Sequence, residues 1–238
     1  MLENAVLITG ASRRVGLFLA EKFLTRTDYP VIVTYRTQCP EIKRLKNLGA
    51  LVFQVDLTDK DELFQFVQAF LKQVKSLRLI VHNASIWADD ERVTKTPELF
   101  EQMVTLHQQV PWYLNFAFKP LLYSCSEEKS DIIHLTDSRV TMGSGQYSAY
   151  LSTKAGLENL TKSFAIQFAP KVKVNSIAPG LLMFHPDDSQ AYRSKRLNEQ
   201  LLPHEPGAVV IWQAIQSLMN NDYVTGVSLP VDGGVRLA

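Results

Sequence analysis

Short apolar runs alternate along this chain with longer amphipathic segments, and this alternation constrains the fold more than any other feature of the sequence. The apolar runs are rich in β-branched residues and fall at 5–9, 30–35, 51–57, 77–84, 130–137, 171–180 and 226–234. Apolar residues at helical spacing lie between most of them, over 16–26, 41–48, 60–75, 97–124 with a break at Pro111, and 147–169. Continuous apolar strands joined by crossover helices bury both faces of a sheet. The sequence therefore predicts a seven-stranded parallel sheet with helices on both sides.

The chain is predicted to form a single α/β domain of the doubly wound Rossmann type that spans residues 1–238. Its 238 residues are enough to bury a sizeable core, and no repeat, low-complexity segment or linker divides them. The longest irregular stretch is 181–206, and an excursion of this length in a compact domain is usually a lid or a binding element. We therefore expect 181–206 to form a substrate loop or lid.

Charge and composition exclude several classes of partner. The formal net charge is +1 and the basic residues are scattered, which gives no electrostatic reason to expect nucleic acid or a membrane surface. No apolar run approaches the roughly 20 residues of a membrane helix, and the N-terminus lacks a signal-peptide pattern. Cys39 and Cys125 show neither metal-ligand spacing nor a disulfide framework. These features predict a cytoplasmic protein without a bound metal.

The turn after the first strand has the composition of a nucleotide-binding loop. Ligands of a doubly wound sheet bind beyond the carboxyl ends of the strands, and here TGASRRVG (9–16) follows the first strand. Gly10 permits the tight turn, Gly16 permits close packing of helix against strand, and the helix N-terminus after Arg13 favours an anion such as pyrophosphate. Arg14 stands where the usual fingerprint has another glycine. A purely structural turn is the alternative, because a pair of glycines is a weak indication.

Residues after the second strand indicate which form of the cofactor binds. Enzymes that use NAD usually place an acidic residue here against the adenosine ribose, whereas this chain has Tyr35, Arg36 and Thr37. A guanidinium suits a 2′-phosphate, and the threonine hydroxyl can add a donor. NADP(H) is therefore favoured over NAD(H), the alternative being that Arg36 is an ordinary solvated cation.

Two further strand ends complete the predicted cofactor site. Asp56, which Leu57 follows, is suited to accept from the adenine amino group, or instead to cap the next helix. The turn Asn83-Ala84-Ser85 follows the fourth strand, and we expect it near the nicotinamide ribose.

Tyr150 and Lys154 form the predicted chemical site. Their i, i+4 spacing places the phenol and the amine on one face of the helix predicted over 147–169. A free tyrosine has a pKa of about 10 and exchanges protons poorly at neutral pH, and a neighbouring ammonium lowers that pKa. The alternative is a chance surface pair, which the position after a nucleotide-binding turn disfavours.

Five motifs together resemble the short-chain dehydrogenase/reductase superfamily. They are TGxxxxxG, NAS after the fourth strand, YxxxK, VNSIAPG and a closing VDGG, and they extend over nearly the whole chain. The resemblance implies that Tyr150 donates a proton and that Lys154 holds the nicotinamide ribose and tunes Tyr150. It also implies that Asn83 shapes the cofactor pocket and that the stretch ending in Pro179 and Gly180 faces the nicotinamide carboxamide.

Departures from the superfamily pattern resemble a narrower group, the pteridine reductases and the bacterial dihydromonapterin reductases. Arg14 replaces a glycine, and Asp137 stands where a catalytic serine is usual, with Ser138 one position on. Trp87 follows the NAS motif, and His107 stands where an asparagine often completes a water relay. In this group the arginine contacts substrate and a phosphate. The resemblance therefore implies that Arg14 bridges the pyrophosphate and a substrate heterocycle without entering the tight part of the turn.

This resemblance implies an NADPH-dependent reduction of 7,8-dihydropterins to the tetrahydro form, in tetrahydromonapterin and folate metabolism. Dihydromonapterin is the expected first substrate and dihydrofolate a weaker one. Trp87 is expected to stack on one face of the flat pterin, with the nicotinamide on the other and Ser85 in the same pocket. Reduction places a hydride at C6 and a proton at N5. Tyr150, Asp137 and a water held by Arg14 are all candidate proton donors, and the sequence does not choose among them.

Individual side chains also have simpler interpretations. Trp87 fits a lid or core aromatic, Asp137 a helix cap or ion pair, and His107 a satisfied buried polar group. Two alternatives for the whole protein are a carbonyl reductase of the same superfamily, acting on a 3-oxoacyl or sugar substrate, and a non-catalytic NADP(H)-binding protein. Asp137 disfavours the first because a carboxylate repels a developing alkoxide. The presence of both Tyr150 and Lys154 disfavours the second.

The resemblance to the superfamily also implies a homo-oligomer, a tetramer or a dimer formed through the long helices. The predicted catalytic residues are Tyr150, Lys154 and Asp137. The predicted substrate-binding residues are Arg14, Ser85, Trp87, Asp137 and Tyr150. The predicted cofactor-binding residues are Gly10, Arg13, Arg14, Gly16, Tyr35, Arg36, Thr37, Asp56, Leu57, Asn83, Ala84, Ser85, Tyr150, Lys154, Pro179 and Gly180.

Overall fold

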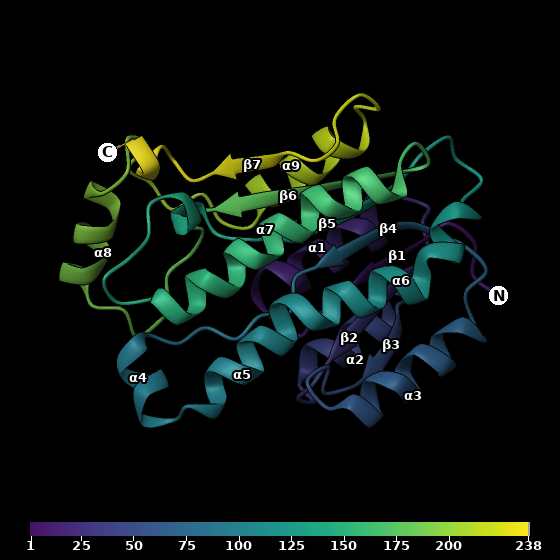
Figure 1. Cartoon of the computed structure of the whole chain (residues 1–238), viewed down its shortest axis with the longest axis horizontal. Coiled ribbons are helices and arrows are strands. Elements are labelled where there is room, and N and C mark those ends of the chain that lie inside the picture. The colour runs from purple at the N-terminus through teal and green to yellow at the C-terminus, as the bar shows by residue number, and fades with distance from the viewer. Residues whose placement is uncertain (238) are drawn as a thin grey trace.

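A seven-stranded sheet runs through the computed structural model, which describes residues 1–237 (Figure 1). Its strand order is β3-β2-β1-β4-β5-β6-β7, and every neighbouring pair is parallel. The strands are β1 (Ala5–Ile8), β2 (Val31–Tyr35), β3 (Leu51–Gln54), β4 (Leu77–His82), β5 (Ser130–Leu135), β6 (Val172–Pro179) and β7 (Ser228–Val231). The predicted doubly wound parallel sheet is confirmed, and each strand lies within the apolar run that predicted it.

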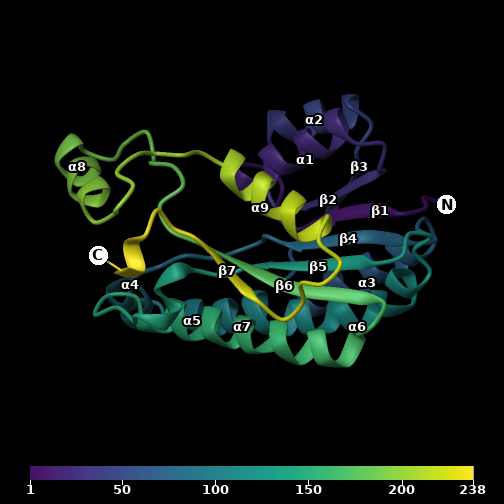
Figure 2. The ribbon, with the colours of Figure 1, turned by 90° about the horizontal axis from the view of Figure 1, so that it is seen from above.

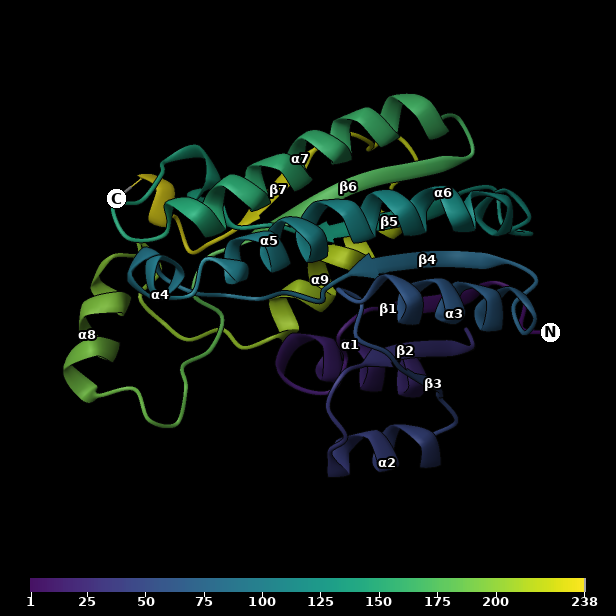
Figure 3. The ribbon, with the colours of Figure 1, turned by 60° about the horizontal axis from the view of Figure 1, so that its bottom comes forward.

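Helices cover both faces of the sheet, which Figure 2 shows edge-on. One face is covered by α1 (Arg14–Arg26), α2 (Pro40–Asn47) and α9 (Val209–Met219). The other is covered by α3 (Lys60–Leu71), α6 (Val110–Tyr123) and α7 (Ser148–Phe168). The shorter helices α4 (Asp90–Lys95), α5 (Glu98–Val104) and α8 (Gln190–Asn198) lie toward the end of the molecule to which the strands point (Figures 1 and 3).

The continuous apolar character of the strands follows from burial on both faces. Val6 and Ile8 of β1 belong to the core under α1, α2 and α9, whereas Ala5 and Leu7 belong to the core under α3, α6 and α7. Successive residues of a strand point to opposite faces, so both positions must be apolar. Each fully buried large side chain of this kind stabilises the fold by about 1.5–3 kcal/mol.

The predicted break at Pro111 is wrong, because the helical path continues through it. A π-helical turn over Thr105–Gln109 joins α5 to α6, and the residues on either side of it keep right-handed helical backbone angles. Pro111 has no N–H to donate to the carbonyl four residues earlier. Since it lies in the first turn of α6, directly after the wider π turn, the missing hydrogen bond does not interrupt the path.

The segment 181–206 is less irregular than the sequence suggested, because it contains α8. The hydroxyl of Ser189 caps this helix by accepting from the Tyr192 N–H. The segment is joined to the body of the fold where Gly207 N–H donates to Leu182 O at 2.8 Å and Leu202 N–H donates to Gly233 O at 2.9 Å. The helices α4 and α9 are not predicted from the sequence.

None of the helices within residues 1–237 combines the length and the apolar character that a membrane crossing requires.

Candidate active site

The candidate site lies at the carboxyl ends of the strands, between β1 and β4. At this point the order in which the chain adds strands to the sheet reverses. From β1 the chain proceeds outward to β2 and β3, and it then crosses back to β4 on the other side. Loops after β1 and after β4 therefore leave in opposite directions and create a crevice, which is where doubly wound sheets bind their ligands.

Gly10 and Gly16 are needed because the turn after β1 packs closely against the turn after β4. A Cβ on Gly10, whose φ is +67°, would lie 2.8 Å from Ala84 Cα, and one on Gly16 would lie 2.7 Å from Gly10 O. The backbone of Asn83 and Ala84 bonds to the Thr9 hydroxyl at 3.0 Å in each case, and Asn83 Nδ2 donates to Thr9 O and Gly10 O. The two turns are thereby locked together. The sequence analysis named the glycines and Asn83 but missed Thr9.

Arg14 combines a left-handed backbone with a contact to the 181–206 segment. Its φ is +52°, a conformation that costs an L-residue roughly 1–2 kcal/mol and that glycine adopts freely. The Arg14 backbone thus occupies the tight part of the turn, contrary to expectation. Its Nη2 donates to Met183 O at 3.0 Å, and Nη1 lies 3.5 Å from His185 Nε2. The exposed guanidinium therefore ties the nucleotide turn to the segment before α8. Arg13, the N-cap residue of α1, is also exposed.

Arg36 and Thr37 are exposed beyond the end of β2, as a cofactor-binding role requires, whereas the Tyr35 ring is buried in the core under α1 and α2. Only the backbone of Tyr35 is therefore left to face a ligand. Arg36 Nη1 lies 3.8 Å from Asp56 Oδ2, and both side chains remain partly accessible. The side chains of Arg36 and Thr37 are therefore accessible to a ligand, and that of Tyr35 is not.

Asp56 closes its own turn rather than capping α3. Its Oδ1 accepts from Thr58 N at 2.9 Å and from Thr58 Oγ1 at 2.7 Å, and the N-cap of α3 is Asp59. Its other oxygen remains near Arg36 and is available to a ligand. Leu57 is buried in the core, so its side chain is not presented to the crevice.

The first turn of α7 carries Tyr150 and is fixed by a residue of α4. Asp90 accepts from Ser148 N at 2.8 Å and from Ala149 N at 3.0 Å, and these two bonds lower the pKa of its carboxyl. A carboxylate at a helix N-terminus also favours the helix dipole. The sequence analysis missed Asp90 because its partners lie 58 and 59 residues away.

Tyr150 and Lys154 are both buried, and α7 places them beside the end of β5. Lys154 Nζ donates to Leu135 O at 2.8 Å and lies 5.7 Å from the centroid of the Tyr150 ring. Burial lowers the pKa of Lys154 to about 8, which the Asp137 carboxylate opposes. The predicted pairing on one helix face is therefore present.

Asp137 follows β5 and is half-buried near the Tyr150 hydroxyl. It accepts from Arg139 N at 2.8 Å and so caps a short 3-10 helix (Ser138–Thr141), as one alternative anticipated. Burial raises the pKa of Asp137, and the bond from Arg139 opposes this. Ser138 is buried, and its Oγ has no hydrogen-bond partner within residues 1–237.

The pKa of Tyr150 shifts in the opposite direction to the sequence-based expectation. Burial raises it most, and the neighbouring Asp137 carboxylate raises it further. Burial and the Asp137 carboxylate therefore outweigh the interaction with Ser85, which lowers the pKa of Tyr150. A phenol with a raised pKa keeps its proton at neutral pH and is a weaker acid than a free tyrosine, so Tyr150 is protonated in the unliganded site.

Trp87 borders the site and remains 58% exposed. Its ring lies 5.2 Å from the Tyr147 ring, centroid to centroid, at 36° between the planes. Tyr147 precedes α7 directly and was not predicted from the sequence. Trp87 is thus exposed, with the partly buried Tyr147 behind it, and offers a flat ligand a surface for stacking.

The predicted carboxamide-facing stretch ends β6 beside β7. Gly180 N–H donates to Val231 O at 3.0 Å, and a Cβ on Gly180 would lie 2.8 Å from Asp232 Cα. Pro179 pairs with Val231 across the two strands. Glycine is required here for close approach of the backbones, which brings this stretch to the same edge of the sheet as Tyr150.

Comparisons with known proteins agree with this geometry. The family description for short chain dehydrogenases matches residues 4–191. The dihydromonapterin reductase of Klebsiella pneumoniae is 43% identical over 229 residues, which cover 96% of this chain and 95% of that protein. The enzyme of the same name from Escherichia coli K12 is 41% identical over 232 residues, 98% of this chain and 96% of that protein.

Solved structures share the fold. FolM alternative dihydrofolate reductase 1 from Brucella suis, in complex with NADP, has a TM-score of 0.86 at 25% identity, over 100% of this chain and 97% of that chain. A 4-hydroxyisoleucine dehydrogenase complexed with NADH has a TM-score of 0.88 at 22% identity, over 99% of this chain and 100% of that chain, and supports the fold alone.

Proposed function

Because this chain belongs to the short-chain dehydrogenase family, we propose that it is an NADPH-dependent reductase of 7,8-dihydropterins. Dihydromonapterin is the expected first substrate and dihydrofolate a weaker one, within tetrahydromonapterin and folate metabolism. Two curated relatives at 43% and 41% identity are named dihydromonapterin reductases, and a structural relative named as a dihydrofolate reductase was solved with NADP. The expected compartment is the cytoplasm, where free thiols such as Cys39 and Cys125 persist.

One observation carries the choice of substrate class: a carboxylate, Asp137, lies beside the Tyr150 hydroxyl at the end of β5. In a carbonyl reductase this neighbour would face an oxygen that gains negative charge, and a carboxylate repels such charge. In a dihydropterin the reacting imine gains a proton at nitrogen. The neighbouring ring N–H groups can also donate to a carboxylate. Asp137 therefore favours a nitrogen heterocycle.

The residues at the crevice fit a phosphorylated dinucleotide. The locked glycine turn presents the N-terminus of α1 to a pyrophosphate, and Gly16 lets α1 begin directly against that turn. Arg36 projects beyond β2 with 58% of its side chain exposed, which suits a 2′-phosphate. Bound NADPH would supply the hydride that the reaction adds at C6.

The chain's own residues account for the proton and for substrate orientation. Tyr150 holds its proton at neutral pH and delivers it to N5, and the neighbouring Asp137 carboxylate accepts from a ring N–H of the substrate. Lys154, held by Leu135 O, is placed to bind the cofactor ribose and to stabilise the phenolate that remains. Trp87 and Tyr147 form a stacking surface for the pterin ring.

A substrate screen tests this proposal. NADPH oxidation is measured by absorbance with 7,8-dihydromonapterin, 7,8-dihydrofolate, a ketone and a 3-oxoacyl thioester, and Tyr150→Phe serves as the background control. We expect turnover of the two dihydropterins, faster for dihydromonapterin. Brisk reduction of the thioester without any dihydropterin turnover would instead identify a carbonyl reductase, and no turnover of any substrate would indicate a binding protein.

The cofactor assignment has its own test. We compare kcat/KM with NADPH and NADH for the native protein and for Arg36→Asp, which replaces the guanidinium by the acid that ribose hydroxyls prefer. The native protein is expected to prefer NADPH, and the variant to lose that preference. Equal use of both cofactors by the native protein contradicts the role of Arg36.

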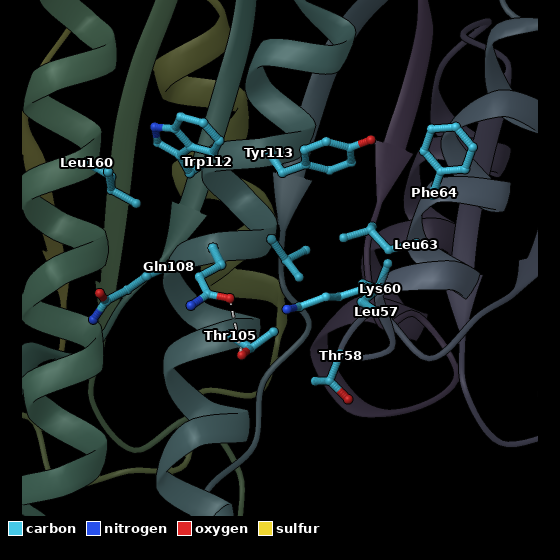
Figure 4. Close-up of a pocket in the computed structure, with 12 residues that line it drawn as sticks. Leu57, Thr58, Lys60, Leu63, Phe64, Thr105, Gln108, Trp112, Tyr113 and Leu160 are labelled. Carbon is cyan, nitrogen blue, oxygen red and sulfur yellow. Dashed lines mark hydrogen bonds between the residues drawn. The ribbon is translucent and has the colours of Figure 1, made fainter.

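We further propose that the chain forms a homo-oligomer, a dimer or a tetramer, through the outer faces of α6 and α7. A groove of about 570 Å³ lies between α3, α6 and α7, and Figure 4 shows Trp112, Tyr113 and Phe64 along it. Trp112 is 50% exposed on α6, and Ile166 is 84% exposed on α7.

A second copy of this chain is the proposed occupant, because the same apolar patch on two copies can cover itself across a two-fold axis. Light scattering of the native protein and of Ile166→Lys tests this, and a monomeric native protein contradicts it.

A further inference from the structure

His107 is a buried histidine that contacts the active site without facing the crevice. It lies in the π-helical turn between α5 and α6 and is almost completely inaccessible. Its Nε2 lies 2.9 Å from Ser85 Oγ and 3.2 Å from Ile86 N, and its Nδ1 lies 2.7 Å from Thr153 Oγ1. The ring meets the Tyr150 ring edge to face, with 5.7 Å between centroids. Both of its nitrogens are therefore engaged.

The contacts determine which nitrogen carries the proton. Burial and the charge of Lys154 lower the pKa of His107, so the ring is neutral and holds a single N–H. The Ile86 backbone N–H can only donate, so Nε2 must be the acceptor and the ring proton must be on Nδ1. Thr153 Oγ1 accepts that proton, because its own hydroxyl donates to Tyr150 O at 2.7 Å. The two sides of the ring thus require the same tautomer.

This tautomer sets the direction of the Ser85 hydroxyl. Nε2 carries no proton, so the 2.9 Å contact can form only if Ser85 donates to it. The Ser85 oxygen then has lone pairs but no proton left for the crevice. Ser85 and Asp137 are both close enough to Tyr150 to shift its pKa, and they shift it in opposite directions. In this tautomer the Ser85 oxygen, like the Asp137 carboxylate, offers acceptors to a ligand beside Tyr150.

We propose that His107 is a positioning residue that determines substrate specificity, by holding Ser85 as a hydrogen-bond acceptor for a ring N–H or amino group of the substrate. The inference rests on the proposed function and adds to it a reason why a 2-amino-4-oxo heterocycle is preferred over a carbonyl compound. A carbonyl oxygen needs donors beside it, and a serine turned toward His107 does not provide one. A nitrogen heterocycle brings its own donors and satisfies both acceptors.

His134 provides a matched control within the chain. It is also buried and its pKa is also lowered by burial, and its Nδ1 lies 2.8 Å from Thr161 Oγ1, two turns of α7 beyond Thr153. Its other nitrogen contacts Asn115 rather than a residue of the crevice. A loss that is common to both histidines therefore reports on packing, whereas a loss confined to His107 reports on the site.

The kinetic test is a double-mutant cycle between His107 and Ser85. We expect Ser85→Ala and His107→Leu each to lower kcat/KM for 7,8-dihydromonapterin by about 5- to 10-fold, the usual effect of one hydrogen bond. The double variant is expected to lose no more than Ser85→Ala alone, because His107 acts through Ser85. His107→Gln, whose side-chain oxygen can accept from Ser85, is expected to restore most of the loss. His134→Leu is expected to leave kcat/KM unchanged.

Additive losses in the double variant, or an equal loss in His134→Leu, would overturn the inference. A second measurement does not depend on turnover. In the native protein with NADPH, histidine nitrogen-15 NMR is expected to show a protonated Nδ1 and an unprotonated Nε2 for His107. A protonated Nε2 overturns the inference even if every variant misfolds. Absence of dihydropterin turnover in the native protein contradicts the proposed function instead, and the NMR result still decides the tautomer.

Discussion

The two ends of the sheet bury charged side chains in different ways. At the amino end, Arg78, Asp131 and Lys173 lie on the adjacent strands β4, β5 and β6 and contact one another through Asp131. Arg78 also donates to Glu127 Oε2 at 2.7 Å, and Lys173 donates to Leu218 O at 2.8 Å at the end of α9. Each charge here has an opposite charge, and the lysine also meets the negative end of a helix dipole.

At the carboxyl end, the buried charges have fewer partners. Within residues 1–237, Lys154 Nζ makes one hydrogen bond, to Leu135 O, and Asp137 accepts one, from Arg139 N. Burial raises the pKa of Asp137 and lowers that of Lys154 to about 8, so both shift toward neutrality. The comparison teaches that the amino end gives each buried charge an oppositely charged neighbour, whereas the carboxyl end leaves Lys154 and Asp137 with one hydrogen bond each.

The largest expected effect is a loss of turnover when a residue at the carboxyl end of the sheet is changed. Tyr150→Phe removes the proton donor at the carboxyl end, and we expect kcat for dihydropterin to fall about 10²- to 10⁴-fold. Lys154→Ala should reduce turnover comparably. NADPH binding to Tyr150→Phe, measured by fluorescence titration, should be nearly native because little contact surface is lost. Near-native turnover of Tyr150→Phe would transfer the proton donor to Asp137.

The next largest effect is a loss of folding stability when the shared carboxylate at the amino end of the sheet is removed. Asp131→Ala leaves Arg78 and Lys173 buried without their shared counter-charge, and we expect the free energy of unfolding in urea to fall by about 3–5 kcal/mol. The exposed partner Asp222 is the control, and Asp222→Ala should cost at most about 1 kcal/mol. Activity per folded molecule should be native in both. A large loss of kcat in folded Asp131→Ala would show that the ends are coupled.

Acid should weaken the middle of the sheet, where His82 is buried beside Asn115. Burial lowers the pKa of His82 to about 4 from an unfolded value of about 6.5. The unfolded chain therefore binds more protons between these values, and stability is lost as the pH falls through this window. For His82 the loss at pH 5 is about 2 kcal/mol.

Comparing native protein with His82→Gln isolates this contribution. The raised pKa values of Asp131 and Asp137 make the fold more stable as the pH falls, because protonation favours the buried carboxyl groups. The native protein and His82→Gln share this contribution. Urea unfolding of each protein at pH 7 and pH 5 is the measurement. Identical pH dependence in the two proteins would mean that His82 does not stay neutral in the fold.

The smallest expected effect is a change in folding stability when Arg14, in the turn after β1, is replaced. Arg14→Gly relieves the left-handed backbone, so the free energy of unfolding should rise by about 1 kcal/mol. NADPH affinity should be retained, while KM for dihydropterin rises because a donor next to the substrate is lost. Unchanged kinetics would assign Arg14 only to its contact with Met183.

Sequence reasoning was most successful where a residue type serves a local need. Gly10 and Gly16 were recognised because the turn leaves no room for a side chain, and Tyr150 and Lys154 because helical spacing puts them on one face. It was wrong for the helix break at Pro111, since the π turn before it could not be inferred from residue types. Asp90 was missed because the N-terminus that it caps belongs to a distant helix.

What the sequence determined by itself is the alternation of strands and helices, and hence which residues stand at the carboxyl ends of the strands. Only the tertiary structure decided how those residues behave. The pKa of Tyr150 rises rather than falls because burial by surrounding elements and the Asp137 carboxylate disfavour the phenolate. The Ser85 hydroxyl points toward His107 because the Ile86 N–H and the Thr153 hydroxyl fix the ring proton of His107 on Nδ1. Desolvation and hydrogen-bond direction depend on groups far apart in the chain, and only packing brings those groups together.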